Sequence, residues 1–99
     1  MPTTRVAVCQ YAIDIDDPDG TRTRLLASVA EAAKARAKVI VLPELCTSGY
    51  VFRDIPEAQS RAEAVGGPTL QLFRELSLKH HAIVVGGFCE RSDDERPFN

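Results

Sequence analysis

Short apolar runs and longer segments with helical periodicity alternate along the chain. The apolar runs occupy residues 5–10, 38–42 and 82–88. In the first run, Val6 and Val8 fall on one side of an alternating pattern, which is the two-residue period of a strand. The other two runs are continuous and rich in β-branched residues, a pattern typical of strands that are buried on both faces. The pattern therefore predicts three strands.

Helices are predicted between these strands. Residues 21–37 carry an apolar stripe at i, i+4 spacing, with the basic residues on the opposite face. The acidic turn before this segment offers Asp17 and Asp19 as helix N-caps. A weaker helix is predicted over residues 55–65 and a third over residues 68–80, where a proline suits the first helical position. Because helices alternate with buried strands, the sequence predicts an α/β fold.

A carboxylate follows the second predicted strand. Pro43 lacks the N–H that a sheet ladder requires and therefore ends the strand, so Glu44 is expected at its carboxyl end. Open α/β sheets collect their ligands at that edge. The loop over residues 46–52 carries a glycine, small hydroxyl side chains and the aromatic residues Tyr50 and Phe52, and is a candidate pocket wall. Glu44 is therefore the candidate catalytic carboxylate.

Composition excludes several classes of function. The 99 residues make one domain at most, with 44% apolar residues, 26% charged residues and a net charge of −2. Because charges of both signs are interspersed, no nucleic-acid or membrane-surface partner is expected. The chain shows no apolar stretch of membrane-spanning length and no secretory signal. The three cysteines are odd in number and show no CxxC spacing, which favours reduced thiols in a cytoplasmic protein.

The motifs resemble those of one enzyme superfamily. The blocks that carry the resemblance are residues 6–10, 39–45, 49–50, 67–68 and 83–87. The most specific block is Leu42-Pro43-Glu44-Leu45 followed by Ser48-Gly49-Tyr50. In order and spacing, the whole chain resembles the N-terminal part of the carbon-nitrogen hydrolases, the nitrilase and amidase superfamily.

This resemblance implies both a fold and an activity. Superfamily members fold as a four-layer α-β-β-α sandwich, of which residues 1–99 would be an incomplete, N-terminal portion. They hydrolyse small-molecule nitriles, amides or N-carbamoyl compounds with a glutamate, a lysine and a cysteine, and the resemblance implies no cofactor and no metal. By the same resemblance, Glu44 is the general base towards the cysteine thiol and Tyr50 lies beside the substrate pocket. Assembly into a homo-oligomer is also implied.

Two members of this catalytic set have no counterpart in the chain. By the resemblance, the lysine would lie on a strand beyond Asn99 and the cysteine on a later strand-to-helix turn. Neither Lys79 nor Cys46 matches those positions. The isolated chain is therefore expected to be an inactive hydrolase fragment, whether it is a truncated gene product, a misannotated reading frame or a deliberate fragment.

Three other interpretations remain open on the sequence alone. Cys46 lies two residues after Glu44 and is a possible nucleophile, although nothing close in sequence activates it and a packed thiol is the simpler interpretation. Asp14, Asp16 and Asp17, together with Glu44, are possible Mg²⁺ ligands of a receiver-like signalling module. That module predicts an aspartate at the end of the third strand, where the chain has none. The third interpretation is an interaction fragment without chemistry.

Overall fold

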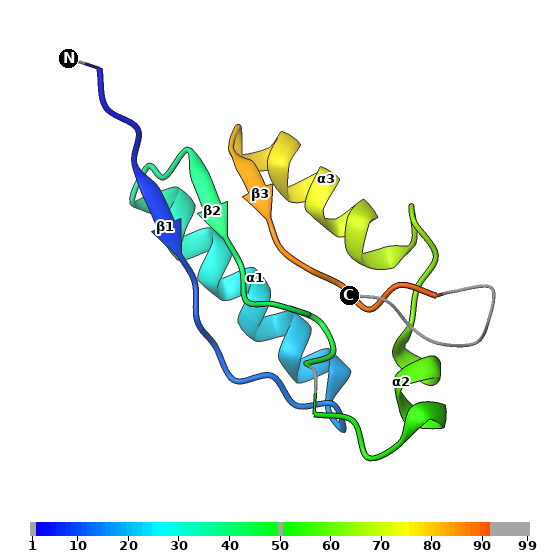
Figure 1. Cartoon of the computed structure of the whole chain (residues 1–99). Helices are drawn as coiled ribbons and strands as arrows, with labels where there is room; N and C mark the ends of the chain where they lie inside the picture. The colour runs from blue at the N-terminus through cyan, green and yellow to red at the C-terminus, as the bar shows by residue number, and fades with distance from the viewer. Residues whose placement is uncertain (1, 50, 92–99) are drawn as a thin grey trace.

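The computed structural model describes residues 2–49 and 51–91, which form three strands and three helices (Figure 1). Their order is β1 (Val6–Val8), α1 (Pro18–Lys34), β2 (Val39–Val41), α2 (Ile55–Arg61), α3 (Pro68–His80) and β3 (Ile83–Val85). The six predicted elements are therefore present in the predicted order, which confirms the α/β class. None of the helices in this described part of the chain is long and apolar enough to cross a membrane.

The strands form a parallel sheet in which β2 lies between β1 and β3 (Figure 1). The register pairs Val39 with Val6 on one side and with Ile83 on the other. The strands are shorter than predicted, but the backbone hydrogen bonds continue past their ends. The Leu42 N–H, for example, donates to the Val85 carbonyl at 2.7 Å. Parallel strands need long crossover connections, and the helices lie in these connections.

Helix α1 begins at Pro18 rather than at residue 21 because Asp17 caps it. The Asp17 carboxylate accepts a hydrogen bond from the Gly20 N–H at 3.0 Å, and Pro18 occupies a position where a missing N–H costs no hydrogen bond. The helix ends at Lys34 rather than at residue 37. Its continuation is stopped by Arg36, whose φ of 65° is left-handed.

Helix α3 has the predicted bounds, whereas α2 is shorter than predicted. Helix α2 ends at Arg61 instead of residue 65 because the following segment is extended and pairs with the end of the described chain. The Glu63 N–H donates to the Cys89 carbonyl, and the Arg91 N–H donates to the Glu63 carbonyl, both at 2.7 Å. Local periodicity does not reveal this pairing, since its two sides are far apart in sequence.

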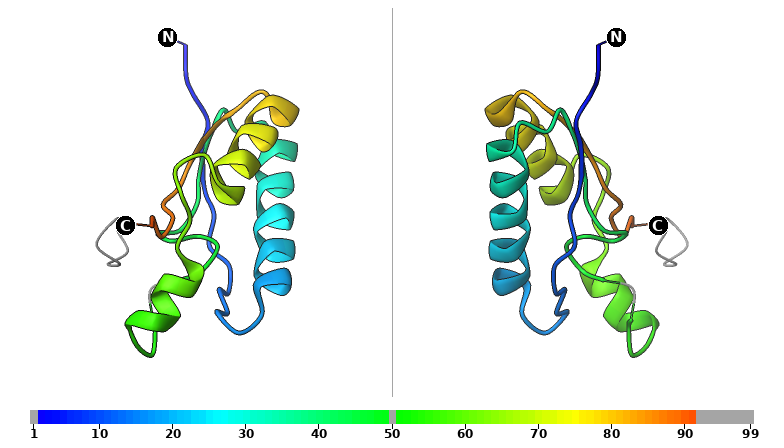
Figure 2. Two further views of the ribbon diagram at one scale, coloured as in Figure 1. Left: turned by 90° about the vertical axis from the view of Figure 1, so that its right-hand side faces the viewer. Right: turned by 90° about the vertical axis from the view of Figure 1, so that its left-hand side faces the viewer.

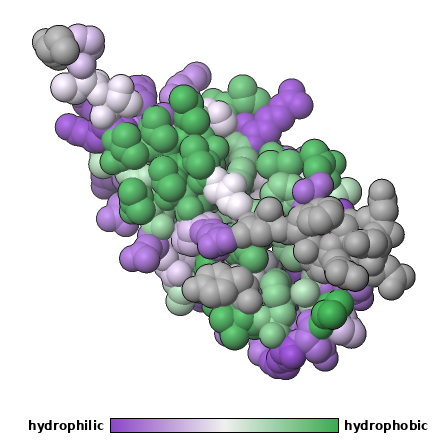
Figure 3. Space-filling view, in the orientation of Figure 1, coloured by the Kyte–Doolittle hydropathy of each residue, from purple (hydrophilic) through white to green (hydrophobic). Residues whose placement is uncertain are grey.

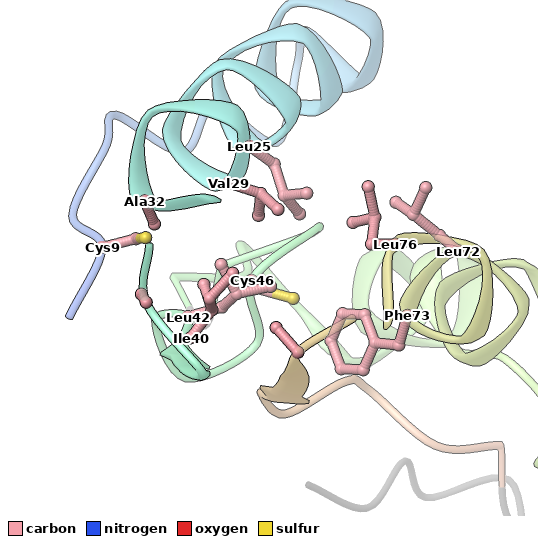
Figure 4. Packing of buried hydrophobic residues seen from close by; sticks show 12 residues of the cluster. Cys9, Leu25, Val29, Ala32, Ile40, Leu42, Cys46, Leu72, Phe73 and Leu76 are labelled. Atoms are coloured by element: carbon pink, nitrogen blue, oxygen red, sulfur yellow. The ribbon is translucent and has the colours of Figure 1, made fainter. Parts of the chain in front are cut away.

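The main core lies between the sheet and helices α1 and α3. Both helices cover the same face of the sheet (Figure 2). Ile40, at the centre of β2, is fully buried in a cluster with Leu25 and Val29 of α1 and with Leu72 and Leu76 of α3 (Figure 4). Burying one such side chain contributes roughly 1.5–3 kcal/mol, so this cluster holds the helices on the sheet.

The opposite face of the sheet carries apolar side chains that no described residue covers. The exposed fractions are 54% for Val6, 76% for Val8, 62% for Ile83 and 47% for Val85, while Val39 and Val41 are half-buried. The register places these six residues on one face, where they form a hydrophobic patch (Figure 3). We call them the open sheet face. Within the described residues only one face of the sheet is covered, so burial of β2 and β3 on both faces stays a prediction.

Candidate active site

Glu44 lies at the carboxyl edge of the sheet. Strand β2 ends at Val41, and two further residues carry the chain into a turn in which Glu44 is exposed. Because β2 is the central strand, the ends of β1 and β3 flank this position (Figure 1). The structure thus confirms the expected location of the carboxylate, at the edge where open α/β sheets bind ligands.

The turn after Glu44 has a defined geometry. Leu45 has a φ of 46° and Gly49 a φ of 72°, both in the left-handed region. The Leu45 carbonyl accepts hydrogen bonds from the Ser48 N–H at 3.1 Å and the Gly49 N–H at 2.7 Å. A Cβ at Gly49 would lie 3.2 Å from Cγ2 of Ile13. The left-handed backbone therefore favours glycine here, and a Cβ would also crowd Ile13, which gives this motif residue a structural role.

Hydrogen bonds from both flanking strands hold Cys46, two residues after Glu44. The Cys46 N–H donates to the carbonyl of Gly87, just beyond β3, at 3.1 Å. The hydroxyl of Tyr11, just beyond β1, donates to the Cys46 carbonyl at 2.8 Å. Sequence reasoning did not identify Tyr11 as part of this site, and no local pattern indicates a contact between residues so far apart. Glu44 is therefore presented by a turn that is anchored across the whole sheet edge.

The Cys46 side chain is unsuited to nucleophilic attack. It is fully buried, and its thiol donates to the Gly87 carbonyl at 3.4 Å. Burial raises the pKa of Cys46 to about 11, and the thiolate is the nucleophilic form of cysteine. The structure therefore favours the packed thiol over the nucleophile at this position.

We expect Cys46 to react with iodoacetamide at pH 8 roughly 100-fold more slowly in the folded chain than in the urea-unfolded chain. The reason is the pKa increase from the usual 9.0 to about 11, which lowers the thiolate fraction. Mass spectrometry of the Cys46 peptide measures both rates. Equal labelling rates in the folded and unfolded states would contradict this assignment.

The raised pKa of Cys46 also makes the stability of the fold depend on pH. Because the pKa is higher in the folded state, the protonated thiol contributes fully to stability below pH 9, and this contribution is lost as the pH rises through about 11.

The structure describes only one of the two aromatic residues that the sequence suggested as part of a pocket wall. Tyr50 lies outside the described residues, so its place beside a pocket stays a prediction. Phe52 packs against a small buried cluster of Leu45, Ala62 and Cys89. Phe52 therefore links the Glu44 turn to the segment after α2 and is a packing residue.

The aspartates considered as Mg²⁺ ligands serve the local structure. The Asp14 carboxylate accepts a hydrogen bond from the Asp16 N–H at 2.9 Å, and Asp17 caps α1. The Asp16 carboxylate forms an ion pair with Arg53 at 2.6 Å. Within residues 2–49 and 51–91, no three His, Cys, Asp or Glu side chains gather in a way that could hold a metal ion. The signalling-module interpretation therefore finds no support in this part of the chain.

Similar sequences are found among nitrilases and amidases. Residues 5–99 match the family model of the carbon-nitrogen hydrolases. The chain is 31% identical over 98 residues to a nitrilase from Paraburkholderia phymatum, which covers 88% of this chain and 29% of the nitrilase. It is 29% identical over 99 residues to the omega-amidase NIT2 of Homo sapiens, which covers 100% of this chain and 34% of that enzyme.

Similar solved structures include an amidase and a CN-hydrolase superfamily protein. A crystal structure of an N-terminal amidase superimposes with a TM-score of 0.81 at 23% identity, over 95% of this chain and 23% of that one, and shows the fold alone. A CN-hydrolase superfamily protein from Xanthomonas campestris superimposes with a TM-score of 0.77 at 28% identity, over 95% and 34% of the two chains. The chain thus spans about a third or less of the length of these relatives. It belongs to the carbon-nitrogen hydrolase family.

Proposed function

We propose that this chain supplies the catalytic glutamate of a hydrolase that acts on small-molecule nitriles, amides or N-carbamoyl compounds by a Glu-Lys-Cys mechanism. The observation that carries the proposal is the placement of Glu44. It is exposed at the carboxyl edge of the central strand, on a turn anchored to the continuations of both neighbouring strands. Family membership supports this role. Tyr50 is proposed to lie beside the substrate pocket.

Glu44 acts as the general base in this mechanism. Attack on a nitrile or amide carbon requires a cysteine thiolate, and a carboxylate within hydrogen-bond reach can accept the thiol proton. The same carboxylate can later accept a proton from the water that hydrolyses the thioester intermediate. A lysine ammonium stabilises the negative charge that develops on the substrate oxygen or nitrogen.

The lysine and the nucleophilic cysteine are proposed to come from sequence beyond Asn99. Neither candidate within the chain replaces them. The Cys46 thiol is fully buried. Lys79 lies in the last turn of α3, directly before the amino end of β3, and therefore at the sheet edge opposite to Glu44. This arrangement supports the proposal that catalysis requires a further segment.

We also propose that the open sheet face packs against a second sheet, which would complete a four-layer α-β-β-α sandwich. The support is the uncovered apolar face, since layered folds bury such faces against another element. Residues 1–99 would then be the N-terminal portion of one domain. The complete enzyme is proposed to be a cytoplasmic homo-oligomer, and the three free cysteines of this chain suit a reducing compartment.

An ammonia-release assay tests this function. Alone, the 99-residue chain is expected to release no more ammonia from primary amides, nitriles and N-carbamoyl amines than its Glu44→Gln variant, because the thiolate nucleophile is missing. Adding the separately expressed remainder of a related carbon-nitrogen hydrolase is expected to restore release with the unmodified chain only. If the unmodified chain alone released more ammonia than its Glu44→Gln variant, the proposal that the lysine and the cysteine come from another segment would be overturned. Equal restoration by both chains would remove Glu44 from the mechanism.

A further inference from the structure

A cavity of about 520 Å³ lies beside the turn that follows Glu44, and Glu44 itself does not line it. The cavity is formed by the first turns of α1 and α3, by the end of α2 and by Thr47 and Ser48. Its volume falls within the range of roughly 300–1,000 Å³ that small-molecule sites occupy. The cavity is therefore large enough to be a second binding site, separate from the candidate catalytic carboxylate.

The charged lining of this cavity is predominantly basic. The charged side chains that line it are Arg22, Arg61, Arg91, Asp19 and Glu63. The Glu63 carboxylate is already engaged at the start of α3, where it accepts hydrogen bonds from the Thr69 N–H at 2.7 Å and the Thr69 hydroxyl at 2.5 Å. Three arginines thus line the cavity together with two acidic residues, and the carboxylate of one of these, Glu63, is directed to a helix terminus. This balance favours an anion.

Arg61 has a buried donor that lacks a partner in the described chain. Its Nη2 donates to the Ile15 carbonyl at 2.7 Å, which holds the guanidinium in place. Its Nε is buried and has no hydrogen-bond partner within residues 2–49 and 51–91. Buried polar groups in proteins are nearly always hydrogen-bonded, and leaving a charged donor unpaired is especially unfavourable. Arg61 also lines the cavity, so an anion bound there would lie beside a guanidinium group that is not fully hydrogen-bonded within the described chain.

We propose that the cavity binds a small oxyanion, carried by a carboxylate or phosphate group, through Arg61 and Arg22. Guanidinium groups form strong charge-assisted hydrogen bonds to both kinds of anion. The hydroxyl groups of Ser60 and Thr69, which also line the cavity, already donate to the Glu57 carbonyl and the Glu63 carboxylate. The arginines therefore carry the recognition. The proposal is independent of the catalytic role of Glu44.

Isothermal titration of the 99-residue chain tests this site, with sodium phosphate in one arm and sodium succinate in the other. Sodium chloride keeps the ionic strength constant, so that general charge screening cancels. Binding is expected to saturate at one anion per chain and to weaken at least about tenfold in Arg61→Gln and in Arg22→Gln, as the loss of a charge-assisted contact predicts. Arg74→Gln is the matched control, because Arg74 is an exposed arginine of α3 that does not line the cavity.

The two arms identify the chemistry of the ligand. Saturation by phosphate alone assigns a phosphate group, and saturation by succinate alone assigns a carboxylate. Arg22 is exposed at the start of α1, so Arg22→Gln keeps the test valid if circular dichroism shows that Arg61→Gln does not fold. Heats equal to those of sodium chloride in both arms, or the same affinity in Arg22→Gln as in Arg74→Gln, would overturn the proposal.

Discussion

Replacing Glu44 by Gln in the complete enzyme is expected to lower kcat by roughly 10²–10⁴-fold while the fold is retained. Glutamine has nearly the same shape as glutamate, but its amide cannot accept the thiol proton. The substitution should not disturb the structure, because Glu44 is exposed and the turn is held by backbone groups and by Tyr11. Steady-state ammonia release measures the loss, and circular dichroism reports the fold.

A matched control separates the chemistry from a general effect of charge. Glu75 is an exposed glutamate of α3, away from the carboxyl edge, and Glu75→Gln is expected to leave kcat unchanged. An unchanged kcat in Glu44→Gln with native circular dichroism would show that Glu44 is structural. A lowered kcat in both variants would point to the net charge of the chain instead.

The second large effect is expected from the open sheet face. In isolation, the 99-residue chain should bind a hydrophobic dye strongly and self-associate through this face. The six apolar side chains of the face lie side by side in register, with Val8 at 76% exposure. Soluble monomers rarely expose contiguous apolar patches larger than a few hundred Å², roughly. The unpaired backbone groups on the outer edges of β1 and β3 add to the tendency to associate.

Charged substitutions on this face provide the test. The double variant Val8→Lys, Val85→Lys is expected to suppress dye binding and to shift sedimentation towards the monomer, because each lysine places a charge among the apolar side chains. The control is Leu78→Lys, since Leu78 is an apolar residue on α3, outside the sheet, whose exposure of 66% lies between those of Val85 and Val8. If the unmodified chain were a compact monomer with a cooperative thermal transition and no dye binding, the prediction of self-association would be wrong. That result would favour a self-sufficient small α/β protein.

Local features of the sequence determined which elements form and in what order. The apolar runs marked all three strands, and a candidate cap and a proline marked where α1 and α3 begin to within a few residues, because these signals act locally. Asp17 was a candidate N-cap and does cap α1. Pro68 marked the start of α3 correctly. Pro43 and the end of the second strand likewise placed Glu44 at the carboxyl edge.

Interactions between distant segments decided the rest. The end of α2 depends on the backbone hydrogen bonds that Glu63 forms with Cys89 and Arg91, which no helical period can encode. The burial of each strand face depends on which layers are present, so the patterns of β2 and β3 suggested two covered faces where the described chain has one.

At the site, the sequence determined that Glu44 follows the end of a strand. Only the folded sheet brought Tyr11 and Gly87 to the turn that presents this carboxylate. Capping and strand preferences act between neighbours along the backbone. Anchoring and burial depend on contacts that exist only once the strands have paired.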